Sequence, residues 1–166
     1  MMISMGIQDF TRRPMSRDDW PLVREWRNSP EVFLFMGTGR EITIDEHMSW
    51  FESRLKDFKV NPVFGYYSED VLIATTRLDF TEKKIYELGI IVNPNFRRKG
   101  VALFCLNDTV AYFFSASLTK NKIVFAKVHP ENEASLNLFK KAGFVDAQIN
   151  QSGYRLLKKE LVQEFS

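Results

Sequence analysis

Residues 90–102 decide how this chain folds, and they read Ile90-Ile91-Val92-Asn93-Pro94-Asn95-Phe96-Arg97-Arg98-Lys99-Gly100-Val101-Ala102. A β-branched run leads into a basic turn and then into a long apolar segment, which predicts a strand, a loop and a helix in that order. The first turn of a helix has N–H groups without intrahelical partners and therefore attracts anions. Gly100 lets a ligand approach the backbone closely. Charge alone would fit a solvated basic loop, but the order of elements favours a pyrophosphate site.

The segments on either side of this stretch predict an α/β (α+β) fold: a mixed, mostly antiparallel sheet with helices on both faces. Strands are expected over residues 8–13, 62–67, 71–79, 84–92, 123–128 and 154–161, and helices over residues 18–27, 43–58, 100–118 and 132–142. Short connections make the second to fourth strands an antiparallel meander. The crossover through residues 100–118 makes the two strands beside it parallel. Thr43 and Glu46 form a capping box, Asn132 caps the last helix, and Gly143 ends it in the left-handed conformation.

Composition and charge exclude several classes of protein. The chain has 166 residues, which predicts a single domain over residues 1–166. Its 23 Lys and Arg against 21 Asp and Glu form no basic stripe, so we expect no nucleic-acid partner. A single cysteine, Cys105, excludes an internal disulfide and a thiolate zinc cluster, and we expect no metal. No apolar run reaches the ~18 residues of a membrane span, and a soluble cytoplasmic protein is expected.

Two motifs resemble those of a known family. Arg97-x-x-Gly100-x-Ala102 resembles the [RQ]-x-x-G-x-[GA] acetyl-coenzyme-A motif of the GNAT superfamily of N-acetyltransferases. Residues 130–144, from Pro130 to Phe144, resemble the second motif of that family. Segments at residues 13–15, 18–19, 25–32, 42–43, 46–51 and 76–79 resemble one branch of the family. This branch includes ribosomal-protein N-terminal acetyltransferases, polyamine acetyltransferases and the amino-sugar-nucleotide acetyltransferases of pseudaminic acid biosynthesis. The resemblance spans roughly residues 10–145.

The resemblance implies where acetyl-CoA binds. The strand over residues 84–92 is expected to bulge, so that the backbone of Ile90 and Val92 pairs with the pantetheine arm. Asn132 and Ser135 are expected to face the same arm. Phe139 stands where many members have a tyrosine that protonates the leaving thiolate, so that acid is missing and solvent or the ammonium product must replace it. The pyrophosphate is expected on the loop residues Arg97, Arg98, Lys99, Gly100, Val101 and Ala102.

The implied reaction is direct attack of a primary amine on the thioester. An alkyl amine, with a pKa of ~10, must first lose a proton. The resemblance assigns that proton to Glu87; Asp79 and Glu25 are the next candidates. His47 and His129 are expected on a helix surface and at a strand end.

The acceptor is expected between the first two helices and the strand ends. Tryptophan offers a flat wall for a sugar or a base, and arginine offers a fork for phosphate or carboxylate. We therefore expect an amino-sugar nucleotide there, with a protein N-terminus or a polyamine as alternatives and a non-catalytic acyl-CoA-binding module as a further one. The protein is expected to be a monomer or a homodimer. The candidate acceptor residues are Trp26, Arg27, Asn28 and Arg77.

Overall fold

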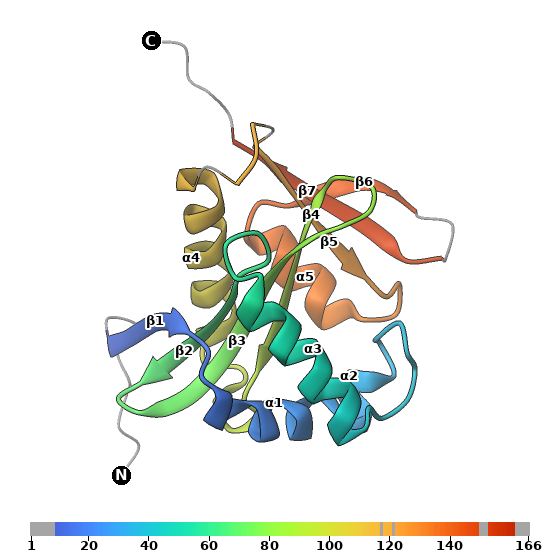
Figure 1. Cartoon of the computed structure of the whole chain (residues 1–166). Helices are drawn as coiled ribbons and strands as arrows, with labels where there is room; N and C mark the ends of the chain where they lie inside the picture. Colours follow the sequence, from blue (N-terminus) through green and yellow to red (C-terminus); the bar gives the residue numbers. More distant parts are fainter. Residues whose placement is uncertain (1–8, 117, 121, 150–152, 162–166) are drawn as a thin grey trace.

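The computed structural model describes residues 9–116, 118–120, 122–149 and 153–161, and their strands form one sheet (Figure 1). The strand order of this seven-stranded sheet is β1-β2-β3-β4-β5-β7-β6, and every neighbouring pair is antiparallel except β4 and β5. The strands are β1 (Phe10–Pro14), β2 (Val63–Ser68), β3 (Val71–Phe80), β4 (Tyr86–Val92), β5 (Ile123–Val128), β6 (Val145–Ile149) and β7 (Arg155–Glu160). The α-helices are α1 (Trp20–Arg27), α2 (Pro30–Phe33), α3 (Ile44–Lys56), α4 (Val101–Ser115) and α5 (Glu133–Lys141).

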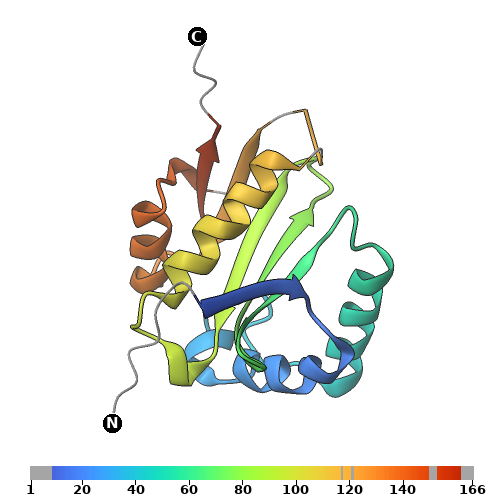
Figure 2. The ribbon, with the colours of Figure 1, turned by 90° about the vertical axis from the view of Figure 1, so that its left-hand side faces the viewer.

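Two apolar layers hold helices against the sheet. Figure 2 shows α4 and α5 side by side along the strands, away from α1 and α3. One core cluster joins α4 and α5 to β3, β4, β5 and β7 through buried side chains such as Phe113, Leu136 and Leu157. A second joins α1 and α3 to β2, β3 and β4 through Val23, Trp26 and Phe51. The mixed sheet between helices that the sequence predicts is therefore confirmed.

Local signals in the sequence are confirmed at several helix ends. The Thr43 hydroxyl accepts a hydrogen bond from the Glu46 amide at 3.1 Å, and the Glu46 carboxylate accepts one from the Thr43 amide at 2.7 Å. Gly143 has a φ of 88°, and the Phe144 ring returns to pack against Phe139. These short-range contacts depend on neighbouring residues only, which is why a linear pattern predicts them.

Other expectations need correction. The strand β6 and the short helix α2 were not predicted, and α4 ends at Ser115 rather than near residue 118. On α3, where an apolar Met48 would be expected to face the core, Met48 is 41% exposed, whereas His47 and Phe51 are buried. The first strand begins at Phe10; Gln8, which the sequence places in it, lies outside the described residues. No helix in the described ranges is both long and apolar enough to span a membrane.

Candidate functional site

A cleft of about 850 Å³ opens where β4 and β5 diverge. The two strands pair at only two positions, Tyr86 with Val124 and Glu87 with Phe125. Beyond Glu87 the two strands separate, and the helices α4 and α5 follow their carboxyl ends. Crevices outside the carboxyl ends of neighbouring parallel strands are recurrent ligand sites. The split between β4 and β5 thus provides a groove with helix N-termini at its mouth.

The α4 end of the cleft is built to hold an anion. Gly100 is the N-cap of α4 with a φ of 76°, and no atom lies within 4 Å of the position that a side chain there would take. Gly100, Ala102 and Leu103 line the cleft at the free N–H groups of the first turn. Arg98, with a φ of 62°, lines it as well.

The other two cations of the loop have partners of their own. Arg97 lines the cleft and forms an ion pair with Glu31 at 2.7 Å, which ties the loop to α2. The Lys99 ammonium lies 5.5 Å from the centroid of the Phe96 ring, and Lys99 is not a lining residue. Val101 is buried in the core, so only its backbone remains to meet a ligand. Within this loop, the positive charge left for a ligand therefore rests mainly on Arg98 and on the helix N-terminus.

The β4 wall differs from the geometry expected of it. Residues 74–80 of β3 pair with residues 86–92 of β4 in one continuous register, without the expected bulge. Divergence from β5 creates the opening instead. Ile90 and Val92 line the cleft, and past Glu87 the β5-facing side of β4 has no strand partner among the described residues. Backbone polar groups need partners, so this edge can pair with an extended ligand.

The α5 wall contains the residues that the second motif indicates. The Asn132 side chain accepts a hydrogen bond from the Ser135 amide at 3.2 Å, which makes it the N-cap, and it also lines the cleft. Ser135 and Phe139 line the same wall, although the Phe139 ring is 96% buried in the core. His129 lies at the end of β5, as expected, with its ring 5.3 Å from that of Phe35 and 5.5 Å from that of Tyr154.

Glu87 lines the cleft at the point where β4 and β5 part. It is half-buried and forms no ion pair within the described part of the chain. The alternative bases are less suitable. Asp79 is held by Arg77 at 2.8 Å and by Arg54 at 2.9 Å, and Glu25 is exposed on α1 and lines neither hollow. Glu87 is the carboxylate best placed to accept a proton in the cleft.

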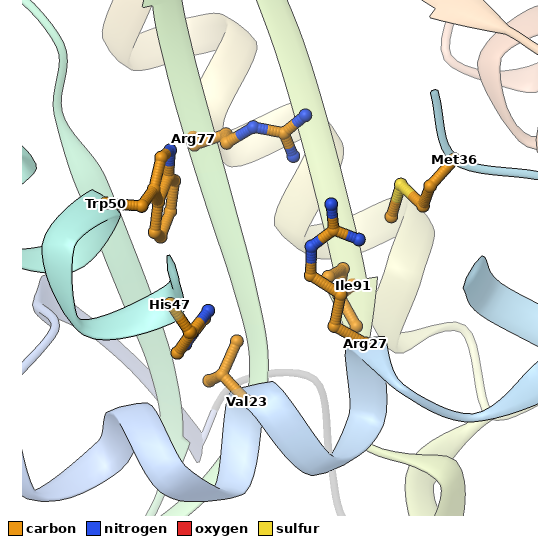
Figure 3. A pocket seen from close by; sticks show the side chains of 7 residues that line it. All are labelled: Val23, Arg27, Met36, His47, Trp50, Arg77 and Ile91. Carbon is orange, nitrogen blue, oxygen red and sulfur yellow. The ribbon is translucent and has the colours of Figure 1, made fainter. Parts of the chain in front are cut away.

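A smaller pocket of about 100 Å³ adjoins the cleft on the α1–α3 side of the sheet (Figure 3). Met36, Arg77 and Ile91 line both hollows, so the two lie side by side. Arg77 reaches this position because its partner on β4 is Gly89: a Cβ there would lie 2.0 Å from the guanidinium. The remaining walls of the pocket are Val23, Arg27, His47 and Trp50.

His47 is the site residue that the sequence misplaces. It is 2% exposed, stacks on Trp50 with ring centroids 5.7 Å apart, and lies inside the pocket instead of on a helix surface. Burial, reinforced by the charge of Arg27, lowers the pKa of His47 from 6.5 to about 4. The imidazole is therefore neutral at physiological pH.

Two of the acceptor candidates, Trp26 and Asn28, stabilise the fold and do not line a hollow. Trp26 is 4% exposed in the α1–α3 core and lines neither hollow. Asn28 exchanges hydrogen bonds of 2.9 and 2.8 Å with the backbone of Ile42, which fixes the loop before α3. We remove both from the acceptor set.

Cys105 is fully buried, and burial raises the pKa of its thiol, as expected of a core residue.

The sequence also missed the wall formed by Phe35, Met36 and Gly37, which follow α2 and line the cleft. Pro30 after Ser29 is a helix-start signal, and it could have indicated α2. A loop that approaches a cleft from a distant segment leaves no periodic pattern, so its position could not be predicted.

Comparison with known proteins shows which family has this architecture. Residues 10–145 match the family model described as Acetyltransferase (GNAT) domain. The chain is 24% identical over 154 residues to Acetyltransferase PseH of Campylobacter jejuni subsp. jejuni serotype O:23/36 (strain 81-176), with 93% of each chain covered.

Solved structures share the fold. Spermidine N-acetyltransferase from Vibrio cholerae, in complex with CoA and spermine, superimposes with a TM-score of 0.75 at 19% identity, covering 91% of this chain and 94% of its own. The structure of yncA from Salmonella typhimurium with its cofactor acetyl-CoA gives 0.75 at 19% identity, covering 95% and 96%.

Proposed function

Since the chain belongs to the GNAT family of acetyltransferases, we propose that it transfers an acetyl group from acetyl-CoA to the primary amine of an amino-sugar nucleotide. The observation that carries the proposal is that two neighbouring hollows share lining residues. The cleft has an anion-binding helix terminus at its mouth and Glu87 at its inner end, and the pocket beyond it contains Arg27 and Arg77.

The cleft fits acetyl-CoA in both charge and shape. The α4 N-terminus and Arg98 would hold the pyrophosphate. The unpaired side of β4 would bind the pantetheine amides, with Asn132 and Ser135 opposite. This arrangement directs the thioester towards Glu87, where the strands meet.

Glu87 would then accept the proton that the ammonium group must lose. The amine nitrogen forms a bond to the acetyl carbon, the carbon–sulfur bond breaks, and the thiolate leaves with its electron pair. Phe139 has no proton to give, so the thiolate takes one from solvent or from the newly acylated ammonium. Proton transfer by a positioned carboxylate contributes typically ~10²–10⁴-fold to such a rate.

The acceptor is assigned from the branch that the N-terminal segments resemble and from the two arginines of the pocket. Arginines bind the oxygens of a diphosphate or a carboxylate, and they disfavour a polycation at the same position. A protein N-terminus is the second candidate, since the open cleft also admits an extended peptide.

An acceptor screen tests the proposal. The purified protein is incubated with acetyl-CoA and one amine at a time, and free thiol is measured, with amino-sugar nucleotides, polyamines and N-terminal peptides compared. We expect turnover to be fastest with an amino-sugar nucleotide. Turnover restricted to peptides or polyamines would refute the acceptor.

A second measurement separates the enzyme from a non-catalytic acyl-CoA-binding module. Acetyl-CoA at 100 times its dissociation constant should stabilise the fold by about 2.7 kcal/mol, seen as a raised melting temperature. Stabilisation without thiol release for any amine would favour the module, and no stabilisation by acetyl-CoA or CoA at millimolar concentration would refute the cofactor assignment.

A further inference from the structure

The small pocket contains two buried polar atoms that lack partners. One guanidinium nitrogen of Arg27, Nη1, and the Nε2 atom of His47 are shielded from solvent and have no hydrogen-bond partner among the described residues. His47 is 98% buried, and both side chains point towards the space between α1, α3 and β3 (Figure 3). A buried polar group without a partner destabilises the fold, and a buried charge does so more strongly.

The nearest carboxylates cannot neutralise Arg27, because other groups already hold them. Glu46 binds Arg40 through both of its oxygens, at 2.7 and 3.1 Å. Asp79 is shared between Arg54 and Arg77. Arg27 therefore has no ion-pair partner in the described part of the molecule.

A second cation approaches Arg27 instead. Arg77 binds Asp79 through Nε at 2.8 Å, and the remainder of its guanidinium extends over Gly89 towards the pocket. Burial and then the charge of Arg77 lower the pKa of Arg27. Two guanidinium groups at one apolar-walled hollow repel one another unless an anion lies between them.

We propose that this pocket binds an acidic group of the acceptor, either one phosphoryl group or a carboxylate, through the guanidinium groups of Arg27 and Arg77. The volume of about 100 Å³ is sufficient for one such group. Because Arg77 and Ile91 line both hollows, the acidic group and the amine would belong to one molecule that spans them. The inference deepens the proposed function and rests on it: it identifies the acceptor as an amine that also has a negatively charged group.

Inorganic phosphate and acetate are suitable probes, since they supply each acidic group without the rest of a substrate. The protein is first saturated with CoA, so that the pyrophosphate site at α4 is filled. Thermal melts are then recorded against phosphate, acetate and chloride at equal ionic strength. We expect phosphate or acetate, but not chloride, to raise the melting temperature.

The decisive variant is Arg27→Gln, with Arg17→Gln as the matched control. Arg17 is an exposed arginine paired with Glu52 outside the pocket, so both variants lose one positive charge. Arg27→Gln should weaken the probe at least about 10-fold, while Arg17→Gln leaves it unchanged. Equal probe binding by the two variants would overturn the proposal. Arg77→Gln provides a second pocket variant should Arg27→Gln fold poorly, and it too should weaken the probe.

Acetyl-CoA distinguishes this inference from the proposed function. Arg27→Gln should retain wild-type stabilisation by acetyl-CoA, because Arg27 does not line the cleft. With an acidic amine acceptor, KM should rise by at least about 10-fold and kcat should change less. Acetyl transfer that proceeds equally well in wild type and Arg27→Gln would refute the acidic subsite and leave the acetyltransferase assignment intact.

Discussion

The burial of His47 predicts that the protein loses stability on mild acidification. Its pKa is about 4 in the folded chain and 6.5 when the side chain is exposed on unfolding. Between these values the unfolded chain binds more protons than the folded one, so the free energy of unfolding falls as the pH is lowered. Above about pH 7 both states are neutral, and His47 contributes no pH dependence.

The magnitude follows from that difference. One pKa unit corresponds to about 1.36 kcal/mol, so His47 alone should remove about 2 kcal/mol between pH 7 and pH 5 and about 3 kcal/mol by pH 4. This is a large part of the 5–15 kcal/mol that typically stabilises a domain. The interval from pH 7 to pH 5 is the useful one, because carboxylates begin to titrate below it.

Urea unfolding at pH 7, 6 and 5 measures the effect, with His47→Gln and His129→Gln compared with wild type. Glutamine does not titrate, so His47→Gln should lose most of the slope. His129→Gln removes the other of the 2 histidines and should retain the slope. Equal slopes in wild type and His47→Gln, or an NMR titration of His47 near pH 6.5, would refute the reasoning.

Three further predictions concern the cleft. Glu87→Gln should lower kcat by ~10²–10⁴-fold with little change in acetyl-CoA affinity, and the loss should shrink towards the pKa of the amine; a loss independent of pH would indicate an orienting role. Gly100→Glu should abolish acetyl-CoA binding, whereas Gly100→Ala, which shares the backbone strain of a side chain at a φ of 76°, should retain it; equal affinities in calorimetry would show that the loop is not the pyrophosphate site. Asn132→Asp keeps the side-chain oxygen that caps α5 but loses the amide donor, so the melting temperature should hold while acetyl-CoA affinity falls, and unchanged affinity would limit Asn132 to its capping role.

The sequence predicted the fold wherever a signal was local. The capping box at Thr43, the glycine after α5 and the strand–loop–helix order at residues 90–102 each depend on contacts between near neighbours. The strand β6 was missed because it pairs at the sheet edge and four of its residues, Val145, Asp146, Ala147 and Gln148, are exposed, so it lacks the apolar alternation of an inner strand.

For the candidate site, the sequence predicted the residues of the cleft better than those of the small pocket. The cofactor residues follow one another in two motifs, so reading the chain in order was enough to group them. The pocket joins Arg27 from α1, His47 from α3 and Arg77 from β3, which are far apart in the sequence. His47 lies four residues before the buried Phe51, which places both on one face of α3, but a polar histidine is not counted in an apolar pattern.

The lowered pKa of His47 and its position in the small pocket are linked, because an anion bound in the pocket would act on the ring. A neutral imidazole accepts one hydrogen bond and donates another, and the pKa of His47 reflects a hydrogen bond to the backbone of Trp20 that favours the charged ring. With that bond in place, Nε2 can donate to an anion only when the ring is protonated. The charges of Arg27 and Arg24 lower the pKa of His47. Arg27 is itself under the influence of the charges of Arg77, Glu46 and Arg40. An anion among them offsets the surplus of positive charge and raises the pKa of His47. Saturating phosphate should therefore reduce the acid loss of stability in wild type and leave His47→Gln unaffected. A polyamine would add to the surplus instead, which is why an acidic amine suits this site better than the spermine bound by the Vibrio cholerae structure.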